Sequence, residues 1–512
     1  MSRMVLLLGI GLAACKPPAP APTAPLGPGE LLLAHTNDLH AHFRPSAAPW
    51  LPTTPEIGGF RAIDAWLDVL ERTHGDERVI YLDGGDLLTG TPLMEYAVHG
   101  AEGGAMLDFL EATGCDAWVL GNHEFDRGWD NTAALVAASP MPALSANVRD
   151  AADPSKGGFP GLQDAVILDA DGIKVGVFGL TTESLTTLAS PETMARLSLT
   201  PSFDAARAQV AALEPQVDLV VALTHSGLDE DRRLAAAVGG IDLIVGGHSH
   251  TSMAEPEHVG GTWIVQAGSY ARQLGLARLR VDGGRLKSIS WDLVDLDPVA
   301  LPGPASPDVI ALVERWGARI DDQYRSPIGE APAALTRRDL DGETVLGRWA
   351  ADVVRRSADA QVGIYNGGGI RADLPAGQLT LGHLYEIFPF NNEVVVFELR
   401  GDQLVGLLLD NVRQRQRGWT PRLVLAGVEW AWTQRMDVPE ITEVKVLGEP
   451  LDPMGTYRVA TNSYVAEQWE KHLGFEPEAL HGVGRTVREA AEEVVRAGPV
   501  IAPVRPAGRE AP

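Results

Sequence analysis

Five short segments between residues 35 and 250 are rich in side chains that bind metal ions: residues 35–40, 83–86, 121–124, 224–225 and 246–250. Their Asp, Asn and His side chains form a mixed set of oxygen and nitrogen donors, which suits a pair of divalent ions ~3.5–4 Å apart. A single Asn-His or Asp-Leu-His would more often belong to a turn or a helix cap. Five such segments in one chain instead indicate a binuclear metal centre and a hydrolytic reaction.

Each of these segments follows an apolar run that is typical of a buried strand: residues 31–34, 79–82, 117–120, 219–223 and 241–245. Helical patterns alternate with these runs, as at residues 105–112 and 203–213. Loops at the carboxyl ends of parallel strands lie along one edge of a sheet. The sequence therefore predicts an α/β domain that gathers the metal-binding side chains at such an edge.

Two further motifs lie in the second half of the chain. They are Asn-Gly-Gly-Gly-Ile-Arg-Ala-Asp at residues 366–373 and Phe-Pro-Phe-Asn-Asn-Glu at residues 388–393. Together with the metal-rich segments, they make the chain resemble the calcineurin-like metallophosphatases, and in detail the bacterial 5′-nucleotidase and UDP-sugar hydrolase family. The resemblance spans roughly residues 30–465. It implies an α/β (α+β) protein of two domains: a four-layer α/β/β/α metallophosphatase sandwich, and a smaller α/β substrate-binding domain connected to it by a linking helix.

The resemblance implies seven metal ligands and two divalent ions, which could be Mn, Zn, Mg or Co. Asp86 is expected to bridge the ions. Asp38, His40 and His250 would complete the first site, and Asn122, His225 and His248 the second. The family often has Gln at the position of His250, so that one type of metal ligand replaces another there. Such a pair of ions would lower the pKa of a bound water molecule to give a metal-activated hydroxide, and would polarise the phosphoryl oxygens.

His123 resembles the catalytic histidine of the family, and Asp126 resembles the carboxylate that orients it. An imidazole held in this way can stabilise negative charge on a transferring phosphoryl group or assist the leaving oxygen. The alternative for an isolated Asn-His pair is that the histidine caps the following helix. Within this set of motifs, the catalytic role is the favoured interpretation.

The second domain should bind the substrate. Arg371 offers a fork of donors for an anion, and the glycines before it let backbone amides approach. By resemblance, the expected substrate-binding residues are Asn366, Gly368, Gly369, Arg371, Phe390, Asn391 and Tyr464. Two departures affect recognition of a base: the first position of the family's aromatic clamp falls near Arg422 or Leu423, and no Gly-Gly-Asp-Gly turn follows Tyr464.

A chain of 512 residues is too long for one hydrophobic core. We expect a metallophosphatase domain at residues 30–297, a linker helix within 298–325, a 5′-nucleotidase C-terminal domain at 326–498 and a disordered tail at 499–512. The linker prediction rests on one apolar helical face, formed by Val309, Val313, Trp316, Ile320 and Tyr324. In the resembled family, this helix joins two domains that rotate against one another.

The N-terminal residues 1–29 resemble a lipoprotein signal followed by a Pro-rich linker. Arg3 precedes an apolar run that is too short to span a membrane, and the run closes with Leu-Ala-Ala-Cys. Cys15 is therefore expected to be lipidated and to anchor the protein in the cell envelope, facing the periplasm or the exterior. An ordinary signal-cleavage site is the alternative. Cys115 is the second of the two cysteines, so a lipidated Cys15 would leave no intramolecular disulfide.

The formal net charge of −26 and the lack of a basic tract argue against a nucleic-acid polymer as partner. A small phosphate ester is the expected substrate, the lipid the only membrane attachment, and a monomer the expected state. The favoured function is hydrolysis of nucleotide phosphate esters. A related dimetal hydrolase acting on 2′,3′-cyclic nucleotides, UDP-sugars or thiosulfate esters is the first alternative. A non-catalytic metal- or ligand-binding lipoprotein is the second.

Overall fold

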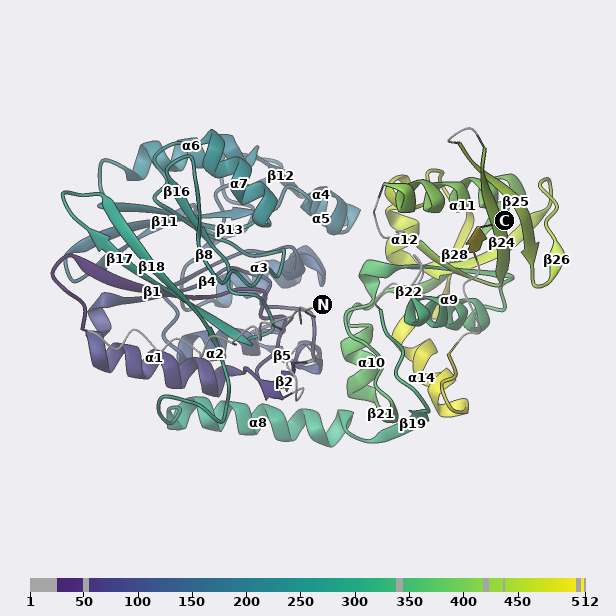
Figure 1. Ribbon diagram of the computed structural model, residues 1–512, viewed down its shortest axis with the longest axis horizontal. Coiled ribbons are helices and arrows are strands. Elements are labelled where there is room, and N and C mark those ends of the chain that lie inside the picture. The colour runs from purple at the N-terminus through teal and green to yellow at the C-terminus, as the bar shows by residue number, and fades with distance from the viewer. Residues whose placement is uncertain are drawn as a thin grey trace, which may run out of the picture.

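The computed structural model describes residues 25–48, 55–337, 344–417, 423–435, 438–502 and 508–510. These residues form two lobes, and the long helix α8 (Pro307–Tyr324) runs beneath the first lobe toward the second (Figure 1). Cys15 lies outside the described residues, as do the other residues of 1–24. Within the described residues, no helix is both long enough and apolar enough to cross a membrane.

The first lobe contains two six-stranded sheets. One has the order β18 (Leu286–Asp295), β17 (Gln273–Val281), β1 (Glu30–Thr36), β4 (Val79–Asp83), β7 (Ala117–Val119) and β8 (Ala143–Leu144). The other has the order β10 (Ala165–Ala170), β11 (Ile173–Thr181), β13 (Leu219–His225), β14 (Leu243–Val245), β16 (Thr262–Val265) and β15 (Glu257–Val259). The strands that precede the metal-rich segments are parallel to one another: β1–β4–β7 in one sheet and β13–β14 in the other.

Residues alternate between the two faces of each strand, and this alternation makes the layers. Leu31 and Leu33 of β1 face the second sheet and share the core between the sheets with Val221 of β13. Leu32 of β1 faces α1 (Phe60–His74) and α2 (Ala105–Ala112) on one outer surface. Val220 of β13 faces α6 (Ser202–Leu213) and α7 (Leu228–Ala237) on the other. The predicted four-layer α/β/β/α sandwich is confirmed.

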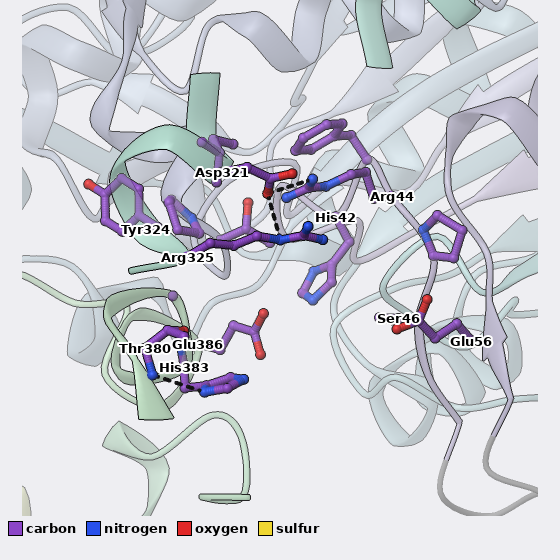
Figure 2. A pocket seen from close by; sticks show the side chains of 16 residues that line it. His42, Arg44, Ser46, Glu56, Asp321, Tyr324, Arg325, Thr380, His383 and Glu386 are labelled. Atoms are coloured by element: carbon purple, nitrogen blue, oxygen red, sulfur yellow. Dashed lines mark hydrogen bonds and ion pairs between the residues drawn. The ribbon is translucent and has the colours of Figure 1, made fainter. Parts of the chain in front are cut away.

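Helix α8 covers the outside of the first helical layer. Ser306 caps its first turn, since its hydroxyl accepts the amide hydrogen of Val309. The apolar face predicted from the spacing packs against α1 and α2, with Val309, Val313, Trp316 and Ile320 buried and Tyr324 half-buried. The C-terminal end of α8 borders a cavity of about 360 Å³ between the lobes, where Arg44 and Arg325 both pair with Asp321 (Figure 2).

The second lobe is built on a mixed sheet of order β23 (Leu423–Ala426), β20 (Val362–Asn366), β27 (Thr456–Asn462), β22 (Glu393–Arg400) and β28 (Glu478–Thr486). Helices α9 (Val345–Ser357), α10 (Leu381–Ile387) and α14 (Val487–Ala497) pack on one face. The other face carries α11 (Gly401–Gln416) and the hairpin β24 (Val428–Arg435)–β25 (Val438–Val446). This arrangement is the predicted smaller α/β domain.

Shorter elements complete the described chain. The remaining strands are β2 (Ser46–Ala47), β3 (Glu56–Ile57), β5 (Ala97–Val98), β6 (Ala101–Glu102), β9 (Val148–Asp150), β12 (Leu197–Leu199), β19 (Pro327–Ala331), β21 (Gly377–Thr380), β26 (Glu449–Pro450) and β29 (Gly508–Glu510). The remaining helices are α3 (Gly128–Ala138), α4 (Leu185–Leu188), α5 (Pro191–Met194), α12 (Ser463–Glu467) and α13 (Trp469–His472). Short 3₁₀ turns are η1 (Asp76–Arg78), η2 (Pro92–Glu95), η3 (His123–Phe125) and η4 (Gly367–Gly369).

The expectation of a disordered tail is wrong for the described part of residues 499–512. Val500 is buried in the core of the second lobe, and its amide donates to the carbonyl of Glu330. The backbone of β29 pairs in parallel with β24. The Pro-rich composition concealed these contacts, because their partners lie far away in the sequence.

Candidate metal centre and substrate cavity

The five metal-rich segments converge where the carboxyl ends of the two sheets meet. Three segments follow β1, β4 and β7 of one sheet, and two belong to the ends of β13 and β14 of the other. The sandwich therefore brings together two rows of loops from two sheets, and not a single row.

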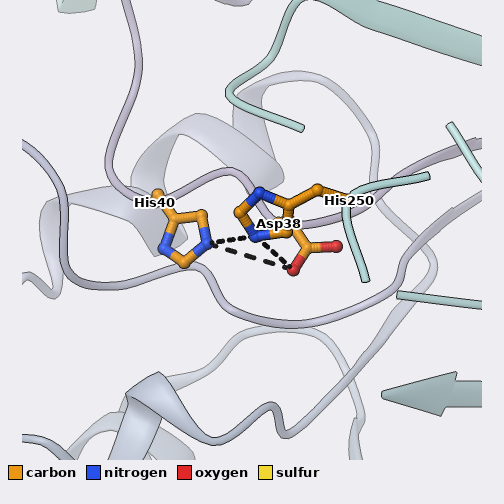
Figure 3. Close-up of side chains that lie close together, drawn as sticks. All are labelled: Asp38, His40 and His250. Atoms are coloured by element: carbon orange, nitrogen blue, oxygen red, sulfur yellow. Dashed lines mark hydrogen bonds and ion pairs between the residues drawn. The ribbon is translucent and has the colours of Figure 1, made fainter. Parts of the chain in front are cut away.

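The first group of candidate ligands is Asp38, His40 and His250 (Figure 3). The Nε2 atom of His250 lies 3.2 Å from Asp38 Oδ1 and 3.0 Å from the Nε2 atom of His40. His40 Nε2 lies 3.9 Å from Asp38 Oδ1. The donor atoms of these three side chains therefore lie close enough together to hold one ion.

Asp86 lies between this group and a second one. Its Oδ2 atom is 3.0 Å from His225 Nε2 and 3.8 Å from His40 Nε2. Asp86, His225 and His248 can also bring one ligand atom each to within 4.8 Å of one another. A carboxylate in this position can reach ions on both sides, which is the role expected of a bridge.

One buried atom at the cluster, Asn122 Oδ1, makes no hydrogen bond with the described residues. A buried polar atom without a partner costs ~1–3 kcal/mol, so native proteins seldom leave one unexplained. Burial also holds the pKa of His40 well below its ordinary value and lowers that of His248 to about 4. Against the effect of burial, the carboxylates of Asp86 and Asp38 raise the pKa of His225 to about 10 in the absence of an ion. The neutral imidazoles of His40 and His248, the carboxylates and the free amide oxygen of Asn122 are donors that fit divalent metal ions.

The backbone of the cluster is unusual. Five of the seven expected ligands have the left-handed conformation without being glycine: Asp38 (φ 53°), His40 (φ 49°), Asp86 (φ 55°), His248 (φ 75°) and His250 (φ 53°). Such a conformation costs on the order of 1–3 kcal/mol per residue, somewhat less for Asp, and persists where the surroundings enforce it. The fold therefore accepts strain in order to direct these side chains inward.

Glu124 has a positioning role that the sequence reasoning did not assign. Its fully buried carboxylate accepts four backbone N–H groups, from Asp86 (3.1 Å), Leu87 (2.8 Å), Leu88 (3.3 Å) and Gly121 (2.6 Å). These amides belong to the two loops that carry Asp86 and Asn122. One carboxylate therefore ties both loops together behind the ligands. The sequence feature that could have indicated this role is the position of Glu124 directly after the Asn-His pair.

We expect Glu124→Gln to weaken metal binding by ~10–100-fold, the usual cost of losing support behind a ligand. In the variant, the side-chain amide of Gln would present its own N–H groups to backbone N–H donors that bond to a carboxylate oxygen in the wild type. Titration calorimetry with Mn²⁺ would measure the change. Asp64→Asn is the matched control, because Asp64 is also buried and accepts a backbone N–H, from Ser306, far from the cluster. Equal losses in both variants would contradict a specific role for Glu124.

His123 lies beside the metal ligands, and its ring is held by Asp126. The Nδ1 atom is 2.7 Å from Asp126 Oδ2, which also accepts the hydroxyl hydrogen of Thr89 at 2.6 Å. Burial alone would lower the pKa of His123, but the carboxylates of Asp126 and Asp86 outweigh this effect and raise it. The ring, which also lines the cavity, is thus held by its contact with Asp126.

A cavity of about 880 Å³ lies between the two lobes and opens onto the cluster. The first lobe lines it with Asp86, Asn122, His123, Asp126, His248 and His250. The second lobe lines it with all seven of the expected substrate-binding residues: Asn366, Gly368, Gly369, Arg371, Phe390, Asn391 and Tyr464. The smaller cavity near α8 contains none of these residues, so the larger cavity is the candidate substrate site.

Arg371 carries positive charge close to the cluster, since it acts to lower the pKa of both His40 and His123. The ring of Phe390 packs 5.7 Å from that of His123. The amide of Asn366 is already engaged, because its Oδ1 atom accepts a hydrogen bond from Asn462. The cavity therefore places Arg371, the expected anion-binding residue, and the ring of Phe390 near the candidate catalytic histidine.

Recognition of a base finds little support from aromatic rings. Leu423 is buried in the core of the second lobe and does not line the cavity, and Arg422 lies outside the described residues. Tyr464 does line the cavity, but its hydroxyl donates to the carbonyl of Thr187 and its ring meets the edge of His472. Among its described residues, the second lobe thus lines the cavity with the rings of Tyr464 and Phe390, and it has no ring at the first clamp position.

The cavity wall also includes polar and aromatic residues that the sequence did not single out, among them Tyr270, Arg337, Lys471 and His472. Arg337 lies beside the Arg371 loop, where its backbone amide donates to Asp373. The one sequence feature that could have indicated a role for Arg337 is that it belongs to an Arg-Arg pair. Tyr270 packs 5.3 Å from the rings of both His40 and His250, and nothing in its local sequence indicated this.

Two family models match the chain. One, described as calcineurin-like phosphoesterase, matches residues 31–252, and one described as 5′-nucleotidase, C-terminal domain, matches residues 327–475. The trifunctional nucleotide phosphoesterase protein YfkN of Bacillus subtilis is 30% identical over 500 residues. That match covers 88% of this chain, which spans only 33% of the length of that relative.

Solved structures have the same two-lobed architecture. The 5′-nucleotidase precursor from Thermus thermophilus superposes with a TM-score of 0.79 at 28% identity, covering 94% of this chain and 99% of that one. The sulfate thiohydrolase SoxB from the same organism superposes with a TM-score of 0.75 at 22% identity, covering 95% and 97%. At that lower identity, the second likeness concerns the fold alone.

Proposed function

Because the chain belongs to the calcineurin-like phosphoesterases that carry a 5′-nucleotidase C-terminal domain, we propose that it hydrolyses phosphate esters of nucleotides, using two divalent metal ions. One observation carries the proposal: the cluster around Asp86 and the His123–Asp126 pair open onto a cavity that the other lobe lines with Arg371. An anionic ester in this cavity would have its phosphate near the cluster and its leaving group in the second lobe.

In this proposal, different side chains bind the metal ions, bind the phosphate and stabilise the developing charge. Asp38, His40, Asp86, Asn122, His225, His248 and His250 would hold the ions. Bound ions would polarise the phosphoryl group and lower the pKa of a water molecule. Arg371 would bind the phosphate oxygens. His123, oriented by Asp126, would donate a hydrogen bond where negative charge develops on the phosphoryl group or the leaving oxygen.

A substrate panel tests the proposal. Purified protein with added Mn²⁺ would be assayed on 5′-nucleotides, UDP-sugars, 2′,3′-cyclic nucleotides and a thiosulfate ester, with His123→Ala as the control for contaminating hydrolases. We expect kcat/KM to be highest for 5′-nucleotides. A higher value for another ester would assign the protein to that chemistry, and binding without turnover of any ester would favour the non-catalytic alternative.

We expect Arg371→Ala to raise KM for all 5′-nucleotides together, by roughly 10–100-fold, because a hydrogen bond to a charged group contributes ~1.5–3 kcal/mol. Tyr464→Ala should raise KM less, since stacking on one ring is worth ~1–3 kcal/mol for any base and the hydroxyl is already bonded to Thr187. Steady-state kinetics on AMP, GMP, CMP and UMP would measure both effects. A strong preference for one base that survives Tyr464→Ala would contradict this assignment.

We also propose that Cys15 is lipidated and anchors the protein in the cell envelope, on the basis of the Leu-Ala-Ala-Cys sequence. Cys15→Ser should move the protein from the membrane fraction to the soluble fraction, because no acyl chain could then be attached. Fractionation and mass spectrometry of the mature N-terminus would measure this. An unmodified N-terminus at another residue would refute the proposal.

A further inference from the structure

Four side chains meet beside the cavity and connect the lobes: Glu95 and Arg127 of the first lobe, and Tyr385 and Arg488 of the second. We call them the inter-lobe clamp. Glu95 Oε1 accepts hydrogen bonds from Tyr385 Oη (2.8 Å), Arg127 (2.8 Å) and Arg488 (3.3 Å). Arg127 is also 3.3 Å from Tyr385 Oη. A single carboxylate oxygen therefore holds donors from both lobes.

The partners of Glu95 are largely shielded from water, whereas the side chain of Glu95 itself is 29% exposed. Tyr385 is fully buried, and the side chains of Arg127 and Arg488 are 12% and 16% exposed. The guanidinium of Arg488 lies 4.1 Å above the ring of Tyr385. Burial would raise the pKa of Glu95, but the Tyr385 hydroxyl and the two arginines outweigh it, so Glu95 stays charged. A partly buried charge with several donors contributes more than an exposed ion pair.

The clamp also contacts the wall of the substrate cavity. Arg488 donates to Asn391 Oδ1 at 2.8 Å and to the carbonyl of Phe388 at 3.0 Å. Between these two positions lies Phe390, which packs against His123. Arg127 follows Asp126 in the chain and itself lines the cavity. Both ends of the clamp are therefore attached to the catalytic side of the cavity.

We infer that Glu95 is a positioning residue: it holds α10 and residues 388–391 against the first lobe, and so places Phe390 and Asn391 over His123. The expected change in KM rests on the proposed function, whereas the expected loosening of the contact between the lobes does not. Neutralising Glu95 should loosen the second-lobe wall of the cavity while leaving the metal cluster intact.

The test compares Glu95→Gln with Glu102→Gln. Glu102 pairs with the same Arg127, at 3.3 Å, but its described contacts include no residue of the second lobe. Glu95→Gln should raise KM for a 5′-nucleotide about 10-fold, with kcat within about twofold, the order expected when a coupled charged contact is weakened. It should also speed amide hydrogen exchange in residues 381–392. Glu102→Gln should change neither quantity.

Tyr385→Phe removes the hydroxyl that donates to Glu95 and should reproduce the higher KM and the faster exchange. The double variant Glu95→Gln/Tyr385→Phe should be little worse than either single variant. The inference would be overturned if Glu95→Gln left exchange and KM unchanged, or if Glu102→Gln matched it. Faster exchange without a change in KM would likewise remove the positioning role. If the wild-type protein hydrolyses no nucleotide but Glu95→Gln still speeds exchange, the proposed function fails and the inter-lobe contact stands.

Discussion

Asp86→Ala is expected to abolish turnover and to reduce metal content to background. The Asp86 carboxylate lies within 4 Å of His40, His123 and His225, so its loss removes the group shared by both halves of the cluster. Metal ions contribute several kcal/mol to such reactions, which corresponds to a loss of roughly 10³-fold or more in kcat. Elemental analysis and single-substrate kinetics would measure the two effects.

A matched control separates ligand loss from backbone strain. Asp359 has the same left-handed conformation as Asp86, φ 48° against 55°, but is exposed in the second lobe. Asp359→Ala therefore imposes the same strain on alanine without touching the cluster, and should keep metal and activity. Full activity of the unmodified protein after thorough chelation would refute the metal-dependent mechanism.

His123→Ala should lower kcat by ~10²–10³-fold while leaving metal content near normal. A donor that acts only on the transition state is worth this much, and its removal affects kcat more than binding. Asp126→Asn should lower kcat in the same direction, because it weakens the 2.7 Å contact that orients the ring. Metal analysis alongside kinetics is essential here.

The structure makes the alternative explicit, since His40, Asp86 and His123 could also hold an ion between them. If metal content falls together with kcat in His123→Ala, then His123 is a ligand and the role proposed for it is wrong. His99→Ala is the control: His99 also pairs with a carboxylate, Asp108 at 2.6 Å, but lies on the surface. It should behave as wild type.

Local sequence sufficed for the strands and for the helix between the lobes. The runs before the metal-rich segments became β1, β4, β7, β13 and β14, because alternation and apolar content are properties of consecutive residues. Helix α8 likewise buries the face that its spacing indicated. The prediction of a disordered tail failed for the opposite reason: the amide of Val500 bonds to the carbonyl of Glu330, 170 positions away in the sequence.

Residue types and spacings were enough to predict the α/β class and the strands that precede the metal-rich segments, and the family resemblance carried by the motifs implied the two domains, the sandwich of two sheets and the candidate ligands. These follow from residue types, short spacings and motifs that recur within a few positions. The tertiary structure alone decided three things: the left-handed backbone at Asp86 and its neighbours, the support of two loops by Glu124, and the clamp around Glu95. Each depends on groups brought together across loops or lobes, and such contacts leave no periodic trace in a single chain, because their energy comes from burial and charge in the folded state.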